Sequence, residues 1–172
     1  QTIVARHDHE LERGVALGLE ALAQYQALGD EMGVARCHKK LGELYRLVGQ
    51  PQRSIEHYLT ARATFEAQGD HFEVAWTSMG LGSTHRQLGD LDQAYAHAQR
   101  GLASFERIGS HLGVGHAHNE LGEVDRQRGR HAEAERHYQR ALEAWQSERH
   151  RDTDLVRFNI ALTALARGET DR

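Results

Sequence analysis

The chain has 172 residues, 39% of them hydrophobic, and this length lets a single domain bury a core without disulfide or metal staples. The single cysteine, Cys37, excludes an internal disulfide framework and fits a reducing compartment, so we expect a cytoplasmic protein. The formal net charge of -4 argues against nucleic acid as a partner, and the lack of an apolar run of about 20 residues argues against a membrane span.

One sequence pattern occurs three times at intervals of forty residues. It begins at Leu41, Leu81 and Leu121, and in each copy Leu-Gly is followed by an arginine and then by a second glycine. Other residue types recur at the same interval: Gly29, Gly69 and Gly109; Val34, Val74 and Val114; and the aromatic residues Tyr25, Phe65, Phe105 and Trp145. Such a period predicts a repeat protein in which each repeat is one supersecondary unit.

The segments between the recurring glycines are predicted to be helices. They are rich in alanine, leucine, glutamate, glutamine and arginine, and the only proline, Pro51, stands where a helix would begin. Gly49, Gly89 and Gly129 would separate the two helices of each unit. We therefore expect an all-α chain built from antiparallel helix pairs.

The units follow one another in chain order. Residues 1–30 form a truncated first repeat, in which a second helix over 11–28 follows the stump of a first helix. Complete helix pairs are expected over 31–70, 71–110 and 111–150, with second helices over 51–68, 91–108 and 131–148. A capping helix over 151–168 has an apolar side made of Leu155, Phe158, Ile160, Leu162 and Leu165. Because the chain begins at Gln1, we expect residues 1–172 to be one domain of a longer polypeptide.

The repeat resembles the tetratricopeptide repeat. The first copy has Leu-Gly at 41–42, followed by Tyr45, Gly49, Ser54, Tyr58 and Ala61; the second has Leu81, Gly82, Gly89, Ala94, Ala98 and Gly101; the third has Leu121, Gly122, Gly129, Ala134, Tyr138 and Ala141. The forty-residue period is longer than the usual 34 residues, and it is similar to that of kinesin light chains, Pins-type G-protein signalling modulators and bacterial signalling proteins. The resemblance implies a right-handed α-solenoid, with departures at His38, Ser78 and His118, where an aromatic residue is usual.

The thirteen histidines invite a metal-binding interpretation. His116 and His118 are only two residues apart on a predicted helix and would point to different faces, so we predict no metal site and no cofactor. His57, His97 and His137 recur at the repeat interval. They are interpreted as a half-exposed packing position, and the alternative is a pH-responsive column.

Catalysis has little support in the sequence. Cys37 and His38 are adjacent on a predicted helix and diverge by about 100°, so they do not form a nucleophile and base pair. The sequence also contains no phosphate-binding glycine loop and no nucleophile elbow. We therefore predict that the chain is not an enzyme, and a metal-dependent enzyme is the remote alternative.

The resemblance implies a concave groove lined by the first helix of each pair. The groove positions correspond to Arg36, Lys39, Glu43, Arg46, Trp76, Met79, Ser83, Arg86, His116, Asn119, Glu123 and Arg126. Arg46, Arg86 and Arg126, which we call the arginine column, either present cations to a ligand or interact with the negative ends of their helices. Because Glu43, Ser83 and Glu123 occupy positions where the family's carboxylate clamp has asparagines, a chaperone-binding role is not expected.

These features predict a protein–protein interaction scaffold. The expected partner is a peptide or protein segment with acidic residues around an apolar anchor, which would pack on Trp76 and Met79. The resemblance implies a regulatory or sensory module of a signalling protein. The alternative is a structural module that self-associates, as a homodimer or larger oligomer, through its open repeat ends.

Overall fold

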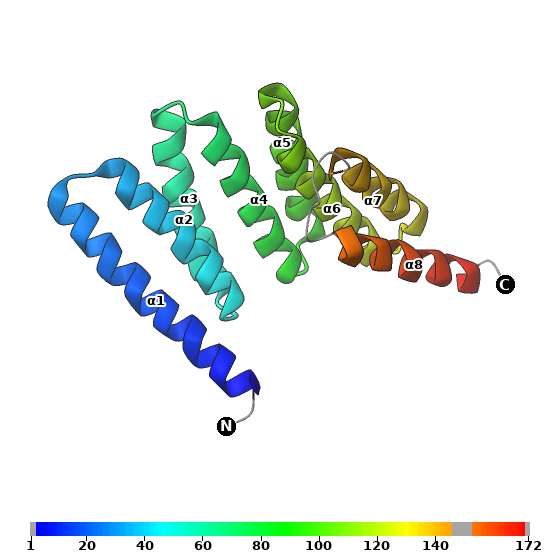
Figure 1. Ribbon diagram of the computed structural model, residues 1–172, viewed down its shortest axis with the longest axis horizontal. Coiled ribbons are helices and arrows are strands. Elements are labelled where there is room, and N and C mark those ends of the chain that lie inside the picture. The colour runs from blue at the N-terminus through cyan, green and yellow to red at the C-terminus, as the bar shows by residue number, and fades with distance from the viewer. Residues whose placement is uncertain (1–2, 146–152, 171–172) are drawn as a thin grey trace.

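The computed structural model describes residues 3–145 and 153–170, and these residues are helical apart from short turns. The helices are α1 (Ile3–Leu28), α2 (Glu31–Leu47), α3 (Pro51–Ala67), α4 (His71–Gln87), α5 (Leu91–Ile108), α6 (His111–Gln127), α7 (His131–Trp145) and α8 (Thr153–Thr170). Each helix packs on the next in the chain, and the helices form a curved α-solenoid (Figure 1). The predicted all-α fold is confirmed.

Local chemistry explains where the helices begin and end. The side chains of Asp30, Asp70, Asp90 and Ser110 accept a hydrogen bond from a backbone N–H of the first turn of the helix that follows. The described turns contain six glycines, from Gly29 to Gly129, with φ between 69° and 79°, a left-handed conformation that other residues rarely adopt. The period of these glycines therefore sets the period of the helices.

The expected stump of a separate first helix is wrong. Residues 3–28 form one continuous helix, α1. The position forty residues before Gly49 is His9, so no glycine interrupts the helix there. The expected second helix over 131–148 is observed as far as Trp145, and residues 146–148 lie outside the described residues, as do 151–152 of the expected capping helix.

Small residues lie where the two helices of a pair approach each other. A Cβ atom built on Gly42 would be 2.9 Å from the ring of Tyr58, and one built on Gly122 would be 2.7 Å from the ring of Tyr138. A Cβ atom on Gly82 would be 3.3 Å from the carbonyl oxygen of Ala94, on the second helix of the same pair. The core is thus a series of layers, and the buried aromatic residues Phe65, Phe105 and Trp145 lie between them.

Candidate binding groove

Residues of the first helices α2, α4 and α6 line one hollow. These helices are neighbours, since α2 contacts α4 and α4 contacts α6 directly. The hollow has a volume of about 390 Å³. It is lined by Lys39, Glu43, Arg46, Tyr58, Trp76, Met79, Gly80, Ser83, His116, Asn119 and Glu120. Eight of the twelve residues named from the sequence are in this set, and Arg36, Arg86, Glu123 and Arg126 are not.

Two members of the arginine column are engaged by carboxylates. The Nε atom of Arg86 donates to Oε1 of Glu120 over 2.7 Å, and Arg126 donates to Oε2 of Glu123 over 2.8 Å. Arg46 differs from both, since its Nε atom is buried without a hydrogen-bond partner among the described residues. Of the three arginines, only Arg46 lines the hollow.

Glu123 connects three helices at the C-terminal end of the stack. It accepts hydrogen bonds from the Tyr138 hydroxyl at 2.6 Å and from Nδ2 of Asn159 at 2.9 Å, in addition to the bond from Arg126. Burial alone would raise the pKa of Glu123, but the hydrogen bonds from Arg126 and Tyr138 outweigh burial and lower that pKa. Glu123 therefore ties α6 to α7 and α8 as an ionised carboxylate.

A second unpaired polar atom belongs to the hollow. The Oδ1 atom of Asn119 is buried and has no hydrogen-bond partner among the described residues. Arg46, at the other side of the hollow, lies beside the phenol of Tyr58, whose pKa is raised to about 12 by burial although Arg46 acts in the opposite direction. The hollow thus contains one donor and one acceptor that the fold itself leaves unsatisfied.

Trp76 and His116, which line the hollow, contact neighbouring aromatic rings. Trp76 contacts Phe105 and His116 with ring centroids 4.9 Å and 5.2 Å apart, and His116 also contacts Trp145 at 5.1 Å. Phe72, one turn before Trp76, contacts it at 6.2 Å and is 45% exposed. Sequence reasoning missed Phe72, although the alignment of this position with Met32 and Leu112 was a signal that it is apolar in every repeat.

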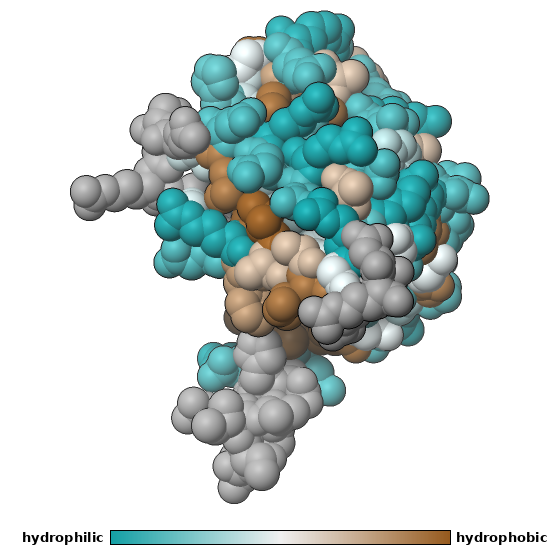
Figure 2. All heavy atoms as spheres, turned by 90° about the vertical axis from the view of Figure 1, so that its right-hand side faces the viewer, coloured by the Kyte–Doolittle hydropathy of each residue, from teal (hydrophilic) through white to brown (hydrophobic). Residues whose placement is uncertain are grey.

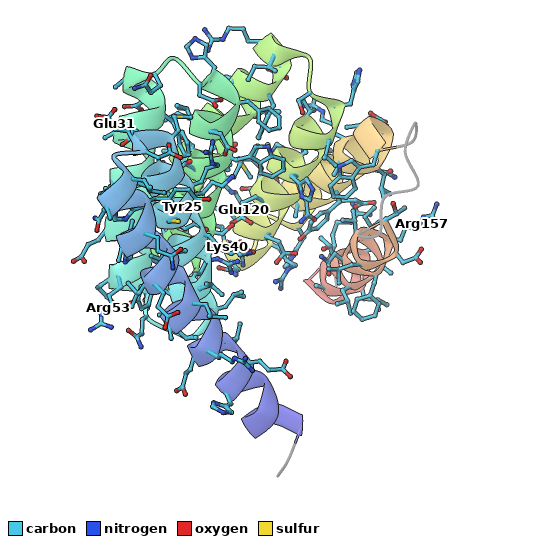
Figure 3. The ribbon with its side chains drawn as sticks, turned by 60° about the vertical axis from the view of Figure 1, so that its left-hand side comes forward. Tyr25, Glu31, Lys40, Arg53, Glu120 and Arg157 are labelled. Carbon is cyan, nitrogen blue, oxygen red and sulfur yellow. The ribbon has the colours of Figure 1, made fainter. Side chains whose placement is uncertain are left out.

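Polar contacts join successive first helices. Lys39 on α2 donates to Glu73 on α4 at 2.5 Å, and Arg86 on α4 pairs with Glu120 on α6. Glu120 lies inside the array, whereas Arg53 and Arg157 lie at its outer edges (Figure 3). Sequence reasoning missed Glu120, because the equivalent positions of the other repeats are Lys40 and Gly80 and no column marks it.

A pair of histidines lies at the contact between the two helices of each complete repeat. The Nδ1 atoms are 2.8 Å apart in His38 and His57 and 3.1 Å apart in His118 and His137. In the middle repeat the rings of His85 and His97 stack with centroids 5.5 Å apart. The recurring column His57, His97 and His137 therefore faces the first helices, and its pairing was not recognised from the sequence.

Burial keeps several of these histidines neutral. It lowers the pKa of His97 and of His118 to about 4, and it also lowers the pKa of His38, His57 and His137. Within residues 3–145 and 153–170, no group of three or more histidine, cysteine, aspartate or glutamate side chains is arranged to hold a metal ion. Burial also raises the pKa of the half-buried Cys37, away from that of a reactive thiolate.

None of the described helices combines the length and the apolar character that crossing a bilayer requires.

Comparison with known proteins assigns the repeat. A family model described as tetratricopeptide repeat matches residues 48–107, 73–147 and 113–172. BtubC (BKLC) from P. vanneervenii has a similar structure with a TM-score of 0.80 and 21% identity, over 95% of this chain and 68% of that one. The apo form of RapI gives a TM-score of 0.80 with 14% identity over 94% of this chain, which spans 45% of RapI.

A putative kinesin light chain repeat protein from Podosopora anserina is also similar, with a TM-score of 0.71 and 14% identity over 96% of this chain and 83% of that one. These identities support a shared fold alone. No curated protein matches the sequence.

Proposed function

Because the chain belongs to the tetratricopeptide repeat family, we propose that it is a protein–protein interaction scaffold whose hollow binds an extended segment of a partner protein. The repeat fold is typically a non-catalytic scaffold. We further propose that the scaffold is a regulatory or sensory module of a signalling protein in the cytoplasm. The resemblance of the repeats to those of signalling proteins supports this role.

One observation carries the binding mode. Arg46 and Asn119 line the same hollow, and each has a buried polar atom that the described residues do not satisfy. A carboxylate or carbonyl of a bound peptide would accept from Arg46, and a peptide N–H would donate to Asn119, after small rotations of both side chains. Leaving such atoms unpaired costs about 1 to 3 kcal/mol each, so a segment that pairs them gains affinity.

The aromatic rings supply the second half of the proposed site. Trp76 lies in the hollow, and Phe72 extends the apolar surface on the same helix. Aromatic side chains in concave sites are the usual anchors of protein interfaces. We therefore expect a partner segment with an aliphatic or aromatic residue near Trp76 and an acidic residue directed to Arg46.

Selection from a displayed peptide library, followed by titration calorimetry of the selected peptides, tests this function. Trp76→Ala and Arg46→Gln should each weaken binding about tenfold or more, which is 1.4 kcal/mol. The matched control is Arg107→Gln, because Arg107 also lies in the last turn of a helix but is exposed and outside the hollow. If all three variants bind selected acidic peptides like the parent chain, the hollow is not the binding site.

Salt provides a separate test of the acidic contact. Exposed charges are screened over about 8 Å at physiological ionic strength, so affinity for the acidic peptides should fall as salt is added. Arg46→Gln should remove most of this salt dependence, whereas Arg107→Gln should preserve it. Affinity that does not respond to salt in the parent chain would count against an acidic partner.

A further inference from the structure

The last helix, α8, leaves a line of apolar side chains uncovered. One side of α8 packs on α7 through the fully buried Val156. On another side, four large apolar residues are between 44% and 67% exposed, and we call them the α8 stripe: Leu155, Phe158, Leu162 and Leu165. Spacings of three, four and three residues place them along one line of the helix. Figure 2 looks onto the end of the stack where α8 lies, and apolar side chains gather there.

The register of α8 shows which side the α8 stripe faces. The buried Val156 and Thr163 stand thirty-nine residues after Ala117 and Val124, which are buried in α6. With this offset, the α8 stripe matches the four groove positions of α6 that were named from the sequence, which are His116, Asn119, Glu123 and Arg126. The α8 stripe therefore continues the groove side of the first helices.

A hydrogen bond between α8 and α6 supports this register. The Nδ2 atom of Asn159 donates to Glu123, which occupies a groove position of α6, over 2.9 Å. Leu155 and Leu162 stand four residues before and three residues after Asn159, so both lie beside it on the helix surface. The α8 stripe thus adjoins the side of α8 that contacts the groove side of α6.

The side of α8 that corresponds to a contact with a second helix is polar. On α6 that side includes Gly115 and His118, whose neighbours belong to α7. With the same offset, the equivalents on α8 are Asp154 and Arg157, which form an exposed ion pair. The α8 stripe is therefore not the face on which a further helix of the stack would pack, and its occupant binds from the groove.

The groove positions change in character from one end of the stack to the other. All four are apolar on α8, and all four are charged on α2, where they are Arg36, Lys39, Glu43 and Arg46. The hollow reaches the α8 end through Asn119, which lies one turn from Glu123 on α6. One face of the first helices therefore joins a charged end, the hollow and an apolar end.

We propose that one partner segment occupies this whole face, with its acidic residue at Arg46 and at least two large apolar side chains on the α8 stripe. This inference rests on the proposed function and adds the order of chemical groups along the segment. Neighbouring helices lie on the order of 10 Å apart, and an extended chain advances about 3.3 Å per residue. Three steps from α2 to α8 should therefore separate the acidic residue from the apolar residues by about nine positions.

The size of the α8 stripe favours such a segment over a second copy of this chain. Each partner of a standard stable interface contributes about 800 Å² of surface, and four half-exposed side chains on one helix offer much less than that. A segment that also fills the hollow does not depend on the α8 stripe alone. Contiguous apolar surface beside a polar groove is typical of a site that binds part of a larger ligand.

Titration calorimetry tests this order with peptides that the parent chain selects from a displayed library. Phe158→Asn gives α8 the residue that α6 has at the equivalent position, and Phe158 is exposed, so the variant should remain folded. It should bind the selected peptides at least tenfold more weakly than the parent chain does. A peptide shortened to its acidic half should bind the parent chain and Phe158→Asn equally. Leu59→Asn is the matched control, because Leu59 is 43% exposed on α3 and outside the hollow, and it should bind like the parent chain.

A nitroxide on the peptide reports the direction of binding. Attached to the apolar end of the peptide, it should broaden the amide resonances of residues 153–165 of the chain. Attached to the acidic end, it should broaden those of residues 36–46. The reverse pattern would overturn the proposed order of groups.

The contrary outcomes separate this inference from the proposed function. If Trp76→Ala and Arg46→Gln weaken binding while Phe158→Asn binds like the parent chain, the hollow binds a segment but the α8 stripe does not take part, and this inference is wrong. If none of the three variants weakens binding, the proposed function fails as well. In light scattering, growth in mass with concentration that Phe158→Asn abolishes would assign the α8 stripe to a second copy and overturn the inference.

Discussion

Arg86 and Glu120 form an ion pair between α4 and α6, with side chains that are only 24% and 9% exposed. Each side chain is the main charged partner of the other, in a place where water has little access to either. Arg86→Met should therefore destabilise the chain by about 2 to 4 kcal/mol, because it leaves the Glu120 carboxylate buried without its partner. Urea denaturation of the variant measures this loss.

The exposed pair Arg136 and Glu133 supplies the control for this prediction. Its side chains are 71% and 47% exposed, so Arg136→Met should cost less than about 0.5 kcal/mol. The double variant Arg86→Met, Glu120→Leu should recover much of the loss, since no unpaired charge then remains. Equal effects of Arg86→Met and Arg136→Met would refute the buried character of the first pair.

Gly82 should be intolerant of a large side chain. A Cβ atom there would lie 3.3 Å from a backbone oxygen of α5, which cannot move aside as a flexible side chain can. Gly82→Leu should therefore cost about 1 to 3 kcal/mol by overpacking. Gly168→Leu is the matched control, because no atom lies within 4 Å of a Cβ built there. A denaturation midpoint that is unchanged in Gly82→Leu would count against the close contact.

Stability should fall as the pH drops below about 6.5. Burial lowers the pKa of His97 and His118 in the folded chain to about 4, from an ordinary value of 6.5. Between these two values the unfolded chain binds more protons than the folded chain, so stability that is present above pH 6.5 is lost as the pH falls. Each residue should contribute on the order of 1 kcal/mol to this loss by about pH 5. Denaturation measured between about pH 8 and 5 tests the effect.

Replacement of one histidine isolates its contribution. His97→Leu should flatten part of the pH dependence, and leucine already occupies the equivalent position of α1 at Leu17. His71 is exposed, so His71→Leu should leave the pH dependence of the parent chain intact. If the melting temperature of the parent chain does not change with pH, protonation of the paired histidines does not destabilise the fold.

Glu123 should hold α8 against the rest of the stack. Glu123→Ala removes the acceptor of Tyr138 and Asn159, and amide hydrogen exchange over residues 153–170 should accelerate about tenfold for each 1.4 kcal/mol lost. Arg157→Ala is the control, because its ion pair with Asp154 is exposed and lies within α8. Protection that is identical in the parent chain and Glu123→Ala would exclude this role.

The sequence predicted features that depend on local chemistry. The glycines with positive φ and the capping aspartates act within a few residues, so their period fixed the helix boundaries of α2 to α6. The continuity of α1 was missed because the repeat alignment places a helix end at His9, where the chain has no glycine. His9 does not end a helix as Gly49 does.

The groove was predicted less completely, for a physical reason. Eight of the expected residues line the hollow because helical spacing places them on one stripe. The pairing of Arg86 with Glu120 depends on the register between two repeats, and Glu120 belongs to no column. The neutral character of His97 likewise depends on burial between helices, and composition does not report burial. Comparison of the repeats at a fixed interval therefore does not predict features that belong to one repeat only.

The polar contacts between first helices also have a mechanical consequence. Lys39 with Glu73, Arg86 with Glu120, and Asn159 with Glu123 all connect first helices to one another along one edge of the array. A force that flattens the curve by separating the first helices must break these contacts, in addition to the layers of apolar packing. The array should therefore resist opening more than its apolar core alone would allow, and its stiffness should decrease when salt weakens the two ion pairs.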